Sequence, residues 1–364
     1  MRNPVLKAVP EDFVVREVMA LPERSAEEPS HTYLNLRKKG FTTFEALALV
    51  AQHLGVPADS VSAAGLKDED GVTEQMISVA ADVPSERLDA FNGNWSPGSG
   101  RWLTLGRAGR GARPVGIGEL LGNAFLLTLR GLDAEQCTRL RAVPRGEACV
   151  LFANYYDTQR FGVAGGPKVT HLIGQALINE DPGMALALLR TSGSHEGDLA
   201  LRHTGGAEEF FAGLDQRVPA FYRTAYSSYL WNHRLARLLE QYAPDVEQVE
   251  RDGLGYTFPR TPRALLGLLA EQGEMEYDKW RWSDGALLRT VSRRPTVLQT
   301  LVGVRKVESD DLFHGMWRCE VTFMLPSGCY ATNMVSQFLL QLGHAGPARP
   351  LSGTATSGGG PHSH

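Results

Sequence analysis

An aspartate stands between two glycines in residues 64–75, and its carboxylate is the group in this segment best suited to chemistry. Asp68 lies between Gly65 and Gly71, and residues 76–80, which follow, have the composition of a strand. Glycine and aspartate favour tight turns, so we expect Asp68 on a loop that enters a sheet. A carboxylate there can serve as a nucleophile or a general base. Local composition by itself favours the alternative, a solvated acidic turn.

Spacing excludes two other motifs. A calcium-binding loop that began at Asp68 would need glycine at its sixth position and glutamate at its twelfth, whereas Thr73 and Val79 stand there. Residues 162–169 resemble a phosphate-binding loop, but Pro167 replaces its second glycine and no hydroxyl follows the lysine. The sequence therefore supports neither an EF-hand nor a nucleoside triphosphate site.

The composition agrees with a soluble enzyme without identifying one, and any surface for nucleic acid would have to be local. The 364 residues suffice for two domains, and 43% of them are hydrophobic. The net charge of −4 argues against a generally basic surface. The four cysteines form no CxxC pair, which argues against zinc and disulfides and favours a reducing compartment. The sequence shows no leader-like or bilayer-spanning run, so we expect a cytoplasmic protein without membrane contact.

Alternating strand-like and helical segments predict an α+β fold. A capping box of Thr42 and Glu45 begins a helix that ends at Gly55. We expect further helices at 134–143, 169–179, 182–190 and 220–242. We expect strands at 12–18, 31–37, 76–79, 101–106, 125–129, 297–304 and 317–324. Residues 346–364, rich in glycine and serine, should form a disordered tail.

Motifs in five segments occur in an order that is typical of one enzyme family. The segments are 7–17, with Lys7, Glu11, Asp12 and Phe13; 65–75, with Asp68, Thr73 and Gln75; 118–130; 154–162; and 323–332. On these motifs the chain resembles the TruD-type tRNA pseudouridine synthases. The resemblance implies a pseudouridine synthase catalytic fold with a mixed, mostly antiparallel sheet flanked by helices. It also implies that a TRUD insertion domain, residues 165–304, interrupts a catalytic domain formed by residues 1–164 and 305–345.

The chemistry that the resemblance implies is an isomerisation. Pseudouridine formation breaks the bond between uracil N1 and ribose C1′ and joins C5 to C1′. Nothing is oxidised or consumed, so we expect no cofactor, metal or ATP. The reaction needs a carboxylate in a pocket that excludes water, and Asp68 is the candidate. Whether Asp68 attacks C6 of the uracil or assists elimination to a glycal stays open.

The resemblance assigns a functional lysine to Lys7, whose ammonium would keep Asp68 ionised. The alternative for Lys7 is a surface lysine beside a strand. We expect Phe13, Asn154 and Tyr156 to wall the flipped uridine by stacking and hydrogen bonding, although the aromatic residues could be ordinary core. Family members are expected to have phenylalanine at position 156 and glycine at position 157, where this chain has tyrosine and aspartate.

Four further residues are candidates for substrate binding. Lys67 should point away from Asp68, because side chains alternate along an extended backbone, and it could then contact a phosphate. Gln159, Arg160 and Phe161 would brace the edge of the site or reach a phosphate.

Three basic clusters could contact RNA through forked hydrogen bonds to phosphate. They are Arg37, Lys38 and Lys39; Arg107, Arg110 and Arg113; and Arg293 and Arg294. Each cluster could instead be a solvated face. Trp280 and Trp282 could stack an extruded base, but a partly buried aromatic strand is the favoured interpretation.

The resemblance implies a monomeric tRNA pseudouridine synthase without an obligate protein partner. Its bacterial members modify uridine 13 of tRNA. One alternative is a non-catalytic RNA-binding protein derived from this fold. The other is a hydrolase with paired carboxylates, Asp68 with Asp70 or Glu74.

Overall fold

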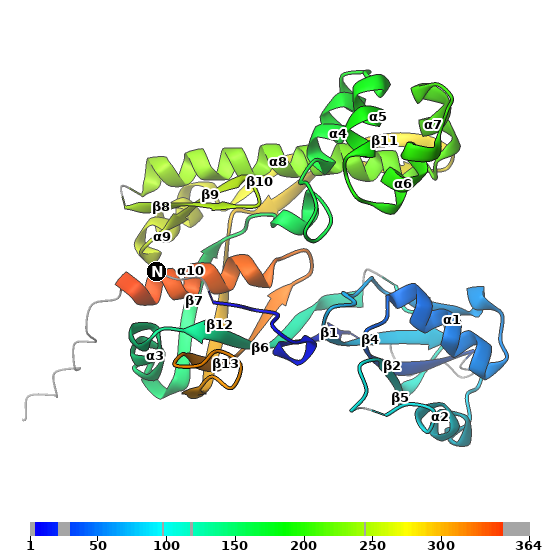
Figure 1. Ribbon diagram of the computed structural model, residues 1–364, viewed down its shortest axis with the longest axis horizontal. Coiled ribbons are helices and arrows are strands. Elements are labelled where there is room, and N and C mark those ends of the chain that lie inside the picture. Colours follow the sequence, from blue (N-terminus) through cyan, green and yellow to red (C-terminus); the bar gives the residue numbers. More distant parts are fainter. Residues whose placement is uncertain (1–3, 21–29, 97, 117–118, 244, 345–364) are drawn as a thin grey trace, which may run out of the picture.

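The computed structural model describes residues 4–20, 30–96, 98–116, 119–243 and 245–344 (Figure 1). A nine-stranded sheet has the strand order β5-β2-β4-β1-β6-β13-β12-β7, and β3 pairs with β4. The strands are β1 Phe13–Met19, β2 His31–Lys39, β3 Val61–Ala63, β4 Val72–Val79, β5 Trp102–Gly111, β6 Leu120–Leu132, β7 Glu147–Ala153, β12 Val297–Ser309 and β13 Trp317–Pro326. The expected tail, 346–364, lies outside the described residues.

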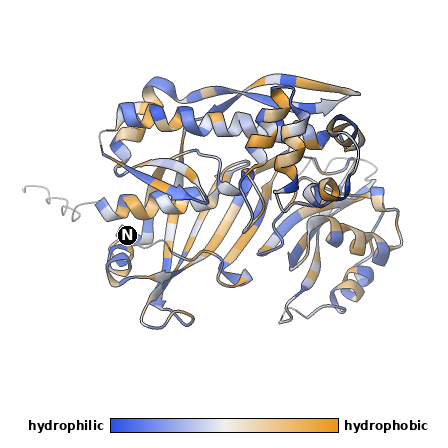
Figure 2. Cartoon of the chain, turned by 45° about the horizontal axis from the view of Figure 1, so that its top comes forward, coloured by the Kyte–Doolittle hydropathy of each residue, from blue (hydrophilic) through white to orange (hydrophobic). Residues whose placement is uncertain are grey.

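The sheet is mixed but mostly antiparallel. Strands β1 and β4 run parallel, with Val14 opposite Val72. The other neighbouring strands of the described sheet are antiparallel, including β1 with β6 and β6 with β13. The predicted α+β class and sheet type are therefore confirmed. The strands carry long apolar stretches (Figure 2), because both sheet halves bury a hydrophobic core.

The half of the sheet that contains β2, β4 and β5 packs against α1 (Thr43–Leu54) and α2 (Ser85–Asn92). The predicted cap is present, since the Thr42 side chain accepts the N–H of Glu45 and Gly55 adopts a φ of 65°. Short 3₁₀ turns lie at Pro10–Asp12, Ala58–Ser60, Pro144–Gly146 and Thr158–Arg160.

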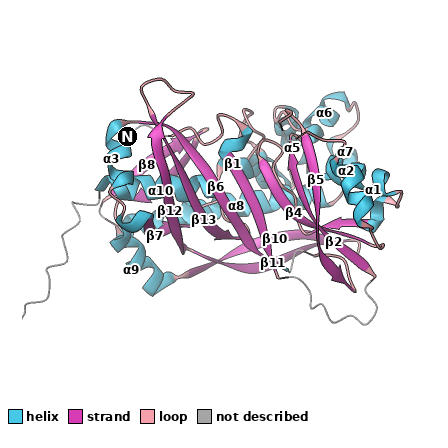
Figure 3. Ribbon diagram, turned by 90° about the horizontal axis from the view of Figure 1, so that it is seen from below, coloured by secondary structure: helices cyan, strands magenta, loops and turns pink. Residues whose placement is uncertain are grey.

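The other half of the sheet packs against α3 (Ala134–Arg141) and α10 (Ala331–His344). The sequence interpretation did not include α10, whose buried Met334 and Phe338 lie one turn apart on the face toward the sheet core. Figure 3 looks onto the strands, with α8 and α10 behind them. Helix α10 thus closes the sheet next to the motif at 323–332.

The segment between β7 and β12 forms a separate layer of helices and two hairpins (Figure 1). Its helices are α4 Thr170–Ile178, α5 Pro182–Arg190, α6 His195–Arg202, α7 Ala207–Gly213, α8 Arg217–Tyr242 and α9 Pro262–Gln272. Its hairpins are β8 Val246–Arg251 with β9 Leu254–Pro259, and β10 Glu274–Ser283 with β11 Ala286–Pro295. Trp280 and Trp282 are partly buried in β10.

The predicted insertion, residues 165–304, ends inside a strand of the large sheet. Strand β12 already begins at Val297 and pairs with β7 from that residue on. The last eight residues of the predicted segment therefore belong to the sheet. None of the described helices is both long and apolar enough to cross a bilayer.

Candidate active site

A hollow of about 340 Å³ opens where all five of the motif segments meet. Phe13 of β1, Thr73 of β4 and both Asn123 and Phe125 of β6 line it. Because β1 lies between β4 and β6, these side chains share one face of the sheet and form the floor. Tyr330, which precedes α10, completes the wall.

Asp68 and Lys7 meet at this hollow. Lys7 Nζ lies 2.9 Å from Asp68 Oδ2, and the two side chains are 34% and 47% exposed. The same ammonium lies 4.2 Å from the centre of the Phe13 ring. A pair so accessible to water contributes little to stability, so its value lies in orienting the carboxylate. The structure therefore brings together three of the predicted site residues.

Buried Lys38 holds the loop that carries Asp68. Its Nζ donates to the carbonyl oxygens of Phe41 at 2.8 Å, Lys67 at 3.1 Å and Asp68 at 2.7 Å. Burial lowers the pKa of Lys38 to about 8, so the ammonium form still predominates at pH 7. Lys38 is wholly buried, which makes its prediction as an RNA contact wrong. It is a structural cation beneath the loop.

Lys67 also turns inward. Its Nζ lies 2.5 Å from Oε1 of Glu17, and the two side chains are only 10% and 1% exposed. The backbone N–H of Lys67 donates to Thr43 Oγ1 at 3.0 Å. The Lys67 side chain was expected to point away from Asp68 and to contact a phosphate. In the structure its ammonium is instead held by the Glu17 carboxylate. Lys67 lines the hollow as half of a buried ion pair.

The segment that carries Lys7 and Phe13 is fixed by Arg130 of β6. Its Nε donates to both carboxylate oxygens of Asp12, at 2.8 and 2.9 Å, and its backbone exchanges two 3.0 Å hydrogen bonds with Val5. Arg130 therefore anchors the chain on both sides of Lys7. Asp12 and Arg130 are 1% and 5% exposed, so this anchor lies inside the protein.

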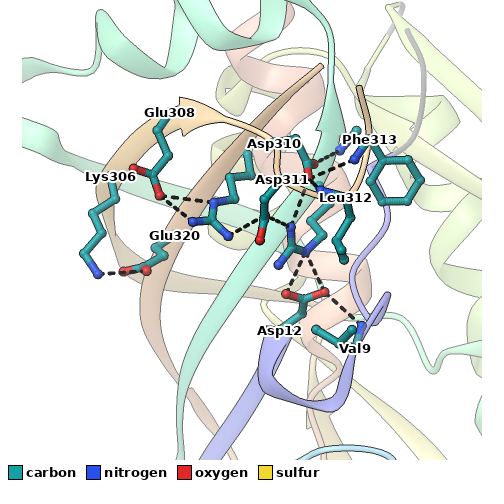
Figure 4. Close-up of polar contacts among 12 residues, drawn as sticks. Val9, Asp12, Lys306, Glu308, Asp310, Asp311, Leu312, Phe313 and Glu320 are labelled. Carbon is teal, nitrogen blue, oxygen red and sulfur yellow. Dashed lines mark hydrogen bonds and ion pairs between the residues drawn. The ribbon is translucent and has the colours of Figure 1, made fainter. Parts of the chain in front are cut away.

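The same guanidinium also binds the loop between β12 and β13. Asp12, Asp310 and Asp311 converge on it (Figure 4), with Arg130 Nη1 lying 2.9 Å from Asp310 and 2.6 Å from Asp311. Burial alone would lower the pKa of Arg130, but its bonds to these carboxylates raise that pKa overall. Arg318 extends the network outward to Asp311 and Glu308. The first motif segment is thus tied electrostatically to β6 and to the loop between β12 and β13.

Asn154 and Tyr156 lie behind the wall and do not line the hollow. The Asn154 side chain donates to Pro295 O at 2.9 Å and accepts from Arg294 Nη2 at 2.6 Å, so both ends of its amide are engaged. The Arg294 guanidinium lies 4.1 Å from the centre of the Tyr156 ring, which packs edge-on against Tyr330. In this conformation Tyr330, and not Tyr156, presents its ring to the hollow.

The three residues that follow have different positions. Gln159 is exposed and lines the hollow. The Arg160 guanidinium lies 4.6 Å from the centre of the Phe221 ring of α8, at the edge of a second hollow that Gln159 also lines. Phe161 has no exposed surface and belongs to the core, so its prediction as a substrate contact is wrong.

The departure from the family pattern at Asp157 is accommodated locally. Its backbone φ is −95°, which any residue can adopt, so no glycine is needed there. Its carboxylate accepts the N–H of Thr158 at 2.9 Å and the hydroxyl of Thr332, and Arg251 lies 3.7 Å away. The added charge is therefore compensated within the protein.

Most of the predicted basic RNA contacts have protein partners. Arg110 pairs with Asp82, Arg113 with Glu119, Arg293 with Glu276 and Lys39 with Glu11. Arg107 donates to Val83 O, and Arg294 is buried. Among the described residues, no group of three or more histidine, cysteine or acidic side chains is arranged to hold a metal, and the cysteines are free.

Comparison with known proteins gives the same assignment as the motifs. The profile of the tRNA pseudouridine synthase D (TruD) family matches residues 3–202, which is more than half of the 364 residues. Curated proteins named tRNA pseudouridine synthase D are similar: that of Syntrophotalea carbinolica is 31% identical over 182 residues, and that of Geobacter sulfurreducens 33% over 186. The Aquifex aeolicus protein of that name is 26% identical over 267 residues, covering 65% of this chain and 67% of its own length.

The similarity to the first two relatives covers 50% and 51% of this chain but only 42% of the length of each relative. A crystal structure of a TruD protein from Methanosarcina mazei superposes with a TM-score of 0.59 over 93% of both chains, at 20% identity. That superposition shows the fold, and the family profile shows the ancestry. This chain belongs to the tRNA pseudouridine synthase D family.

Proposed function

We propose that this protein is an isomerase that converts a specific uridine of tRNA to pseudouridine, with Asp68 as its nucleophile. The observation that carries the proposal is the 2.9 Å contact between Lys7 and Asp68 at the mouth of a hollow with an aromatic floor. Two motif segments far apart in sequence supply this pair, and the family profile covers both. The bacterial members named in the sequence resemblance modify uridine 13, and we propose the same target.

The reaction balances without an external reagent. The bond between N1 and C1′ breaks, C5 becomes bonded to C1′, and a proton leaves C5 while N1 gains one. Asp68 would attack C6 of the uracil or assist elimination at the sugar, and the Lys7 ammonium would hold its carboxylate ionised and in place. Phe13, Phe125 and Tyr330 would stack the base and keep water from the intermediate.

We also propose that the catalytic domain is discontinuous. Strands β12 and β13 complete the sheet that β1, β4 and β6 begin, and the layer at 165–295 is inserted between the two parts. The second hollow, between the Asp68 loop and Phe221, lies where the inserted layer faces the sheet domain. Its lining includes the acidic residues 68–70, so a phosphate of tRNA would lie at its edge, where Arg160 is available.

The test is substitution of the carboxylate. Asp68→Ala should abolish pseudouridine formation while tRNA still binds, because phosphate contacts supply most of the affinity. Lys7→Met should lower turnover strongly, because it removes the ammonium that would hold the Asp68 carboxylate ionised and in place. Asp59→Ala removes an exposed aspartate of the turn at Ala58–Ser60 and should change neither activity nor binding.

Three outcomes separate the alternatives. Wild-type protein that binds tRNA without forming pseudouridine would support a non-catalytic RNA-binding protein. Full turnover by Asp68→Ala would remove the carboxylate from the mechanism. Release of free base would indicate a hydrolase. That last outcome would need a second carboxylate near Asp68. Glu74 is held by Arg16 at 3.0 Å, whereas Asp70 lines the second hollow together with Asp68.

A further inference from the structure

Two polar atoms at the floor of the hollow lack a hydrogen-bond partner among the described residues. They are the hydroxyl oxygen of Thr73 and the amide oxygen of Asn123, and both are buried. A buried polar group without a partner costs roughly 1 to 3 kcal/mol, so proteins retain few of them. Two such atoms lining one hollow point to a ligand that supplies the missing bonds.

The position of the two residues follows from the sheet. Thr73 lies opposite Val15 in the parallel pair of β1 and β4, and Asn123 lies opposite Glu17 in the antiparallel pair of β1 and β6. Val15 and Glu17 are two residues apart on β1 and so point to the same face. Thr73 and Asn123 therefore flank β1 on the same face, with the apolar side chains of Val15 and Phe125 also on the floor.

The chemistry of these atoms complements one edge of uracil. That edge presents the O2 acceptor, the N3–H donor and the O4 acceptor in a row. An amide oxygen can accept N3–H, and a hydroxyl can donate to either carbonyl oxygen. Cytosine has an acceptor at N3, so at that position it cannot donate to the amide oxygen.

This edge also keeps the same pattern of hydrogen-bond donors and acceptors after the base has turned. For C5 to take the place of N1 at the ribose, the detached base can turn by half a rotation about the line through N3 and C6. This turn exchanges O2 with O4 and leaves N3–H where it was. The same acceptor and donor would therefore hold the base before and after the turn.

We propose that Asn123 and Thr73 bind the uracil edge of the target nucleotide, with Asn123 accepting N3–H and Thr73 donating to O2 or O4. This inference rests on the proposed function. Both residues are assigned to binding of the base, and the bond-making role stays with Asp68.

The test uses Thr73→Val, which keeps the side-chain shape and removes the hydroxyl. Because that hydroxyl has no partner among the residues that the structure describes, the variant should be at least as stable as the wild type. Its kcat/KM for tRNA should fall about 5- to 150-fold, the equivalent of roughly 1 to 3 kcal/mol. Thr73→Ser should restore most of the rate, and Asn123→Ala should lose a similar factor.

Thr32→Val is the matched control. The Thr32 hydroxyl is equally buried, but it donates to Ala81 O at 2.6 Å and accepts the N–H of Val83 at 3.2 Å. That variant should lose stability and keep its kcat/KM. The proposal is overturned if Thr73→Val keeps full kcat/KM, or if it loses stability as Thr32→Val does. Wild-type protein that forms no pseudouridine would overturn the proposed function itself, and the inference with it.

Discussion

Arg130→Met tests whether one buried guanidinium holds the segment of Lys7 and Phe13 in place. In the structure Arg130 binds Asp12, Asp310 and Asp311, and the first two of these are 1% and 8% exposed. Methionine would fill much of the space but leave the buried carboxylates without a cation. Breaking a buried ion pair from one side costs about 3 to 5 kcal/mol.

That loss is large against a total stability of roughly 5 to 15 kcal/mol. It should be accompanied by lower turnover, because the backbone hydrogen bonds between Val5 and residue 130 would remain but the anchor at Asp12 would be lost. The assay is urea unfolding combined with a pseudouridine rate on tRNA. A double variant, Arg130→Met with Asp12→Asn, should recover part of the stability because it removes one uncompensated charge.

Arg318→Met is the control, since it removes a guanidinium from the outer part of the same network. Its partners Glu308 and Asp311 are 48% and 58% exposed, so the expected cost is only about 0 to 1 kcal/mol. Equal small losses in the two arginine variants would refute the anchoring role of Arg130.

Acid unfolding provides a second readout of the same network. Burial would raise the pKa of Asp310, but N–H groups of Gly131, Leu312 and Phe313 and the Arg130 guanidinium lower it overall. A carboxyl group with a lowered pKa in the folded state stabilises the protein above its ordinary pKa near 3.8, and this contribution disappears as the pH falls further. The wild type should therefore lose stability below about pH 4, and Arg130→Met should lose less over that range.

Three further predictions concern the surroundings of the site. Wild-type turnover should fall as the pH rises through about 8, because neutral Lys38 would have only two N–H groups for the three carbonyl oxygens that it binds. The pH–rate profile of Lys38→Met should lack this alkaline decrease in turnover. An unchanged decrease in that variant would exclude Lys38 as its origin. Gly71→Ala should destabilise the protein by about 1 to 3 kcal/mol in urea unfolding and slow turnover, since the added Cβ would lie 2.7 Å from the carbonyl oxygen of Phe13. If this variant were as stable as the wild type, β1 would be able to move aside. Tyr156→Phe should stay within about tenfold of the wild-type rate, whereas Tyr156→Ala should lose about 3 to 5 kcal/mol of stability and most activity. Loss of activity in Tyr156→Phe at unchanged stability would assign the hydroxyl a chemical role.

The capping box and the strand alternation made much of the sheet domain predictable. Thr42 and Glu45 cap α1 as expected, because this cap depends only on residues three apart. The meeting of Lys7 and Asp68 is different, since these residues are 61 positions apart and their contact depends on β1 pairing with β4. Composition and periodicity do not encode that pairing, and only the resemblance to a family predicted it.

The misplaced residues show what local reasoning overlooked. Lys38 follows Leu34 and Leu36 at intervals of two along β2, so the alternation already placed it on the buried face. The run of three basic residues, Arg37 to Lys39, suggested an RNA contact instead. Asn154 and Tyr156 follow β7 directly, and nothing in their own segment shows that Tyr330, far along the chain, would stand in front of them. The partners of Arg294 and Asp157 likewise come from distant segments.

Thr73 and Asn123 illustrate the reverse case. Both stand in motif segments, but their sequence context gives no reason to separate them from neighbouring strand residues. Their proposed role rests on an unfilled hydrogen-bonding capacity, which becomes visible only when the pairing of β1 with β4 and β6 places both at one hollow.

The central claim is that Asp68 isomerises a uridine of tRNA, and quantitative mapping of pseudouridine in an unmodified tRNA transcript tests it most directly. The wild type should convert one uridine, at position 13, and Asp68→Ala should convert none at equal tRNA occupancy. Equal conversion by the two proteins, or none by the wild type bound to tRNA, would contradict the account.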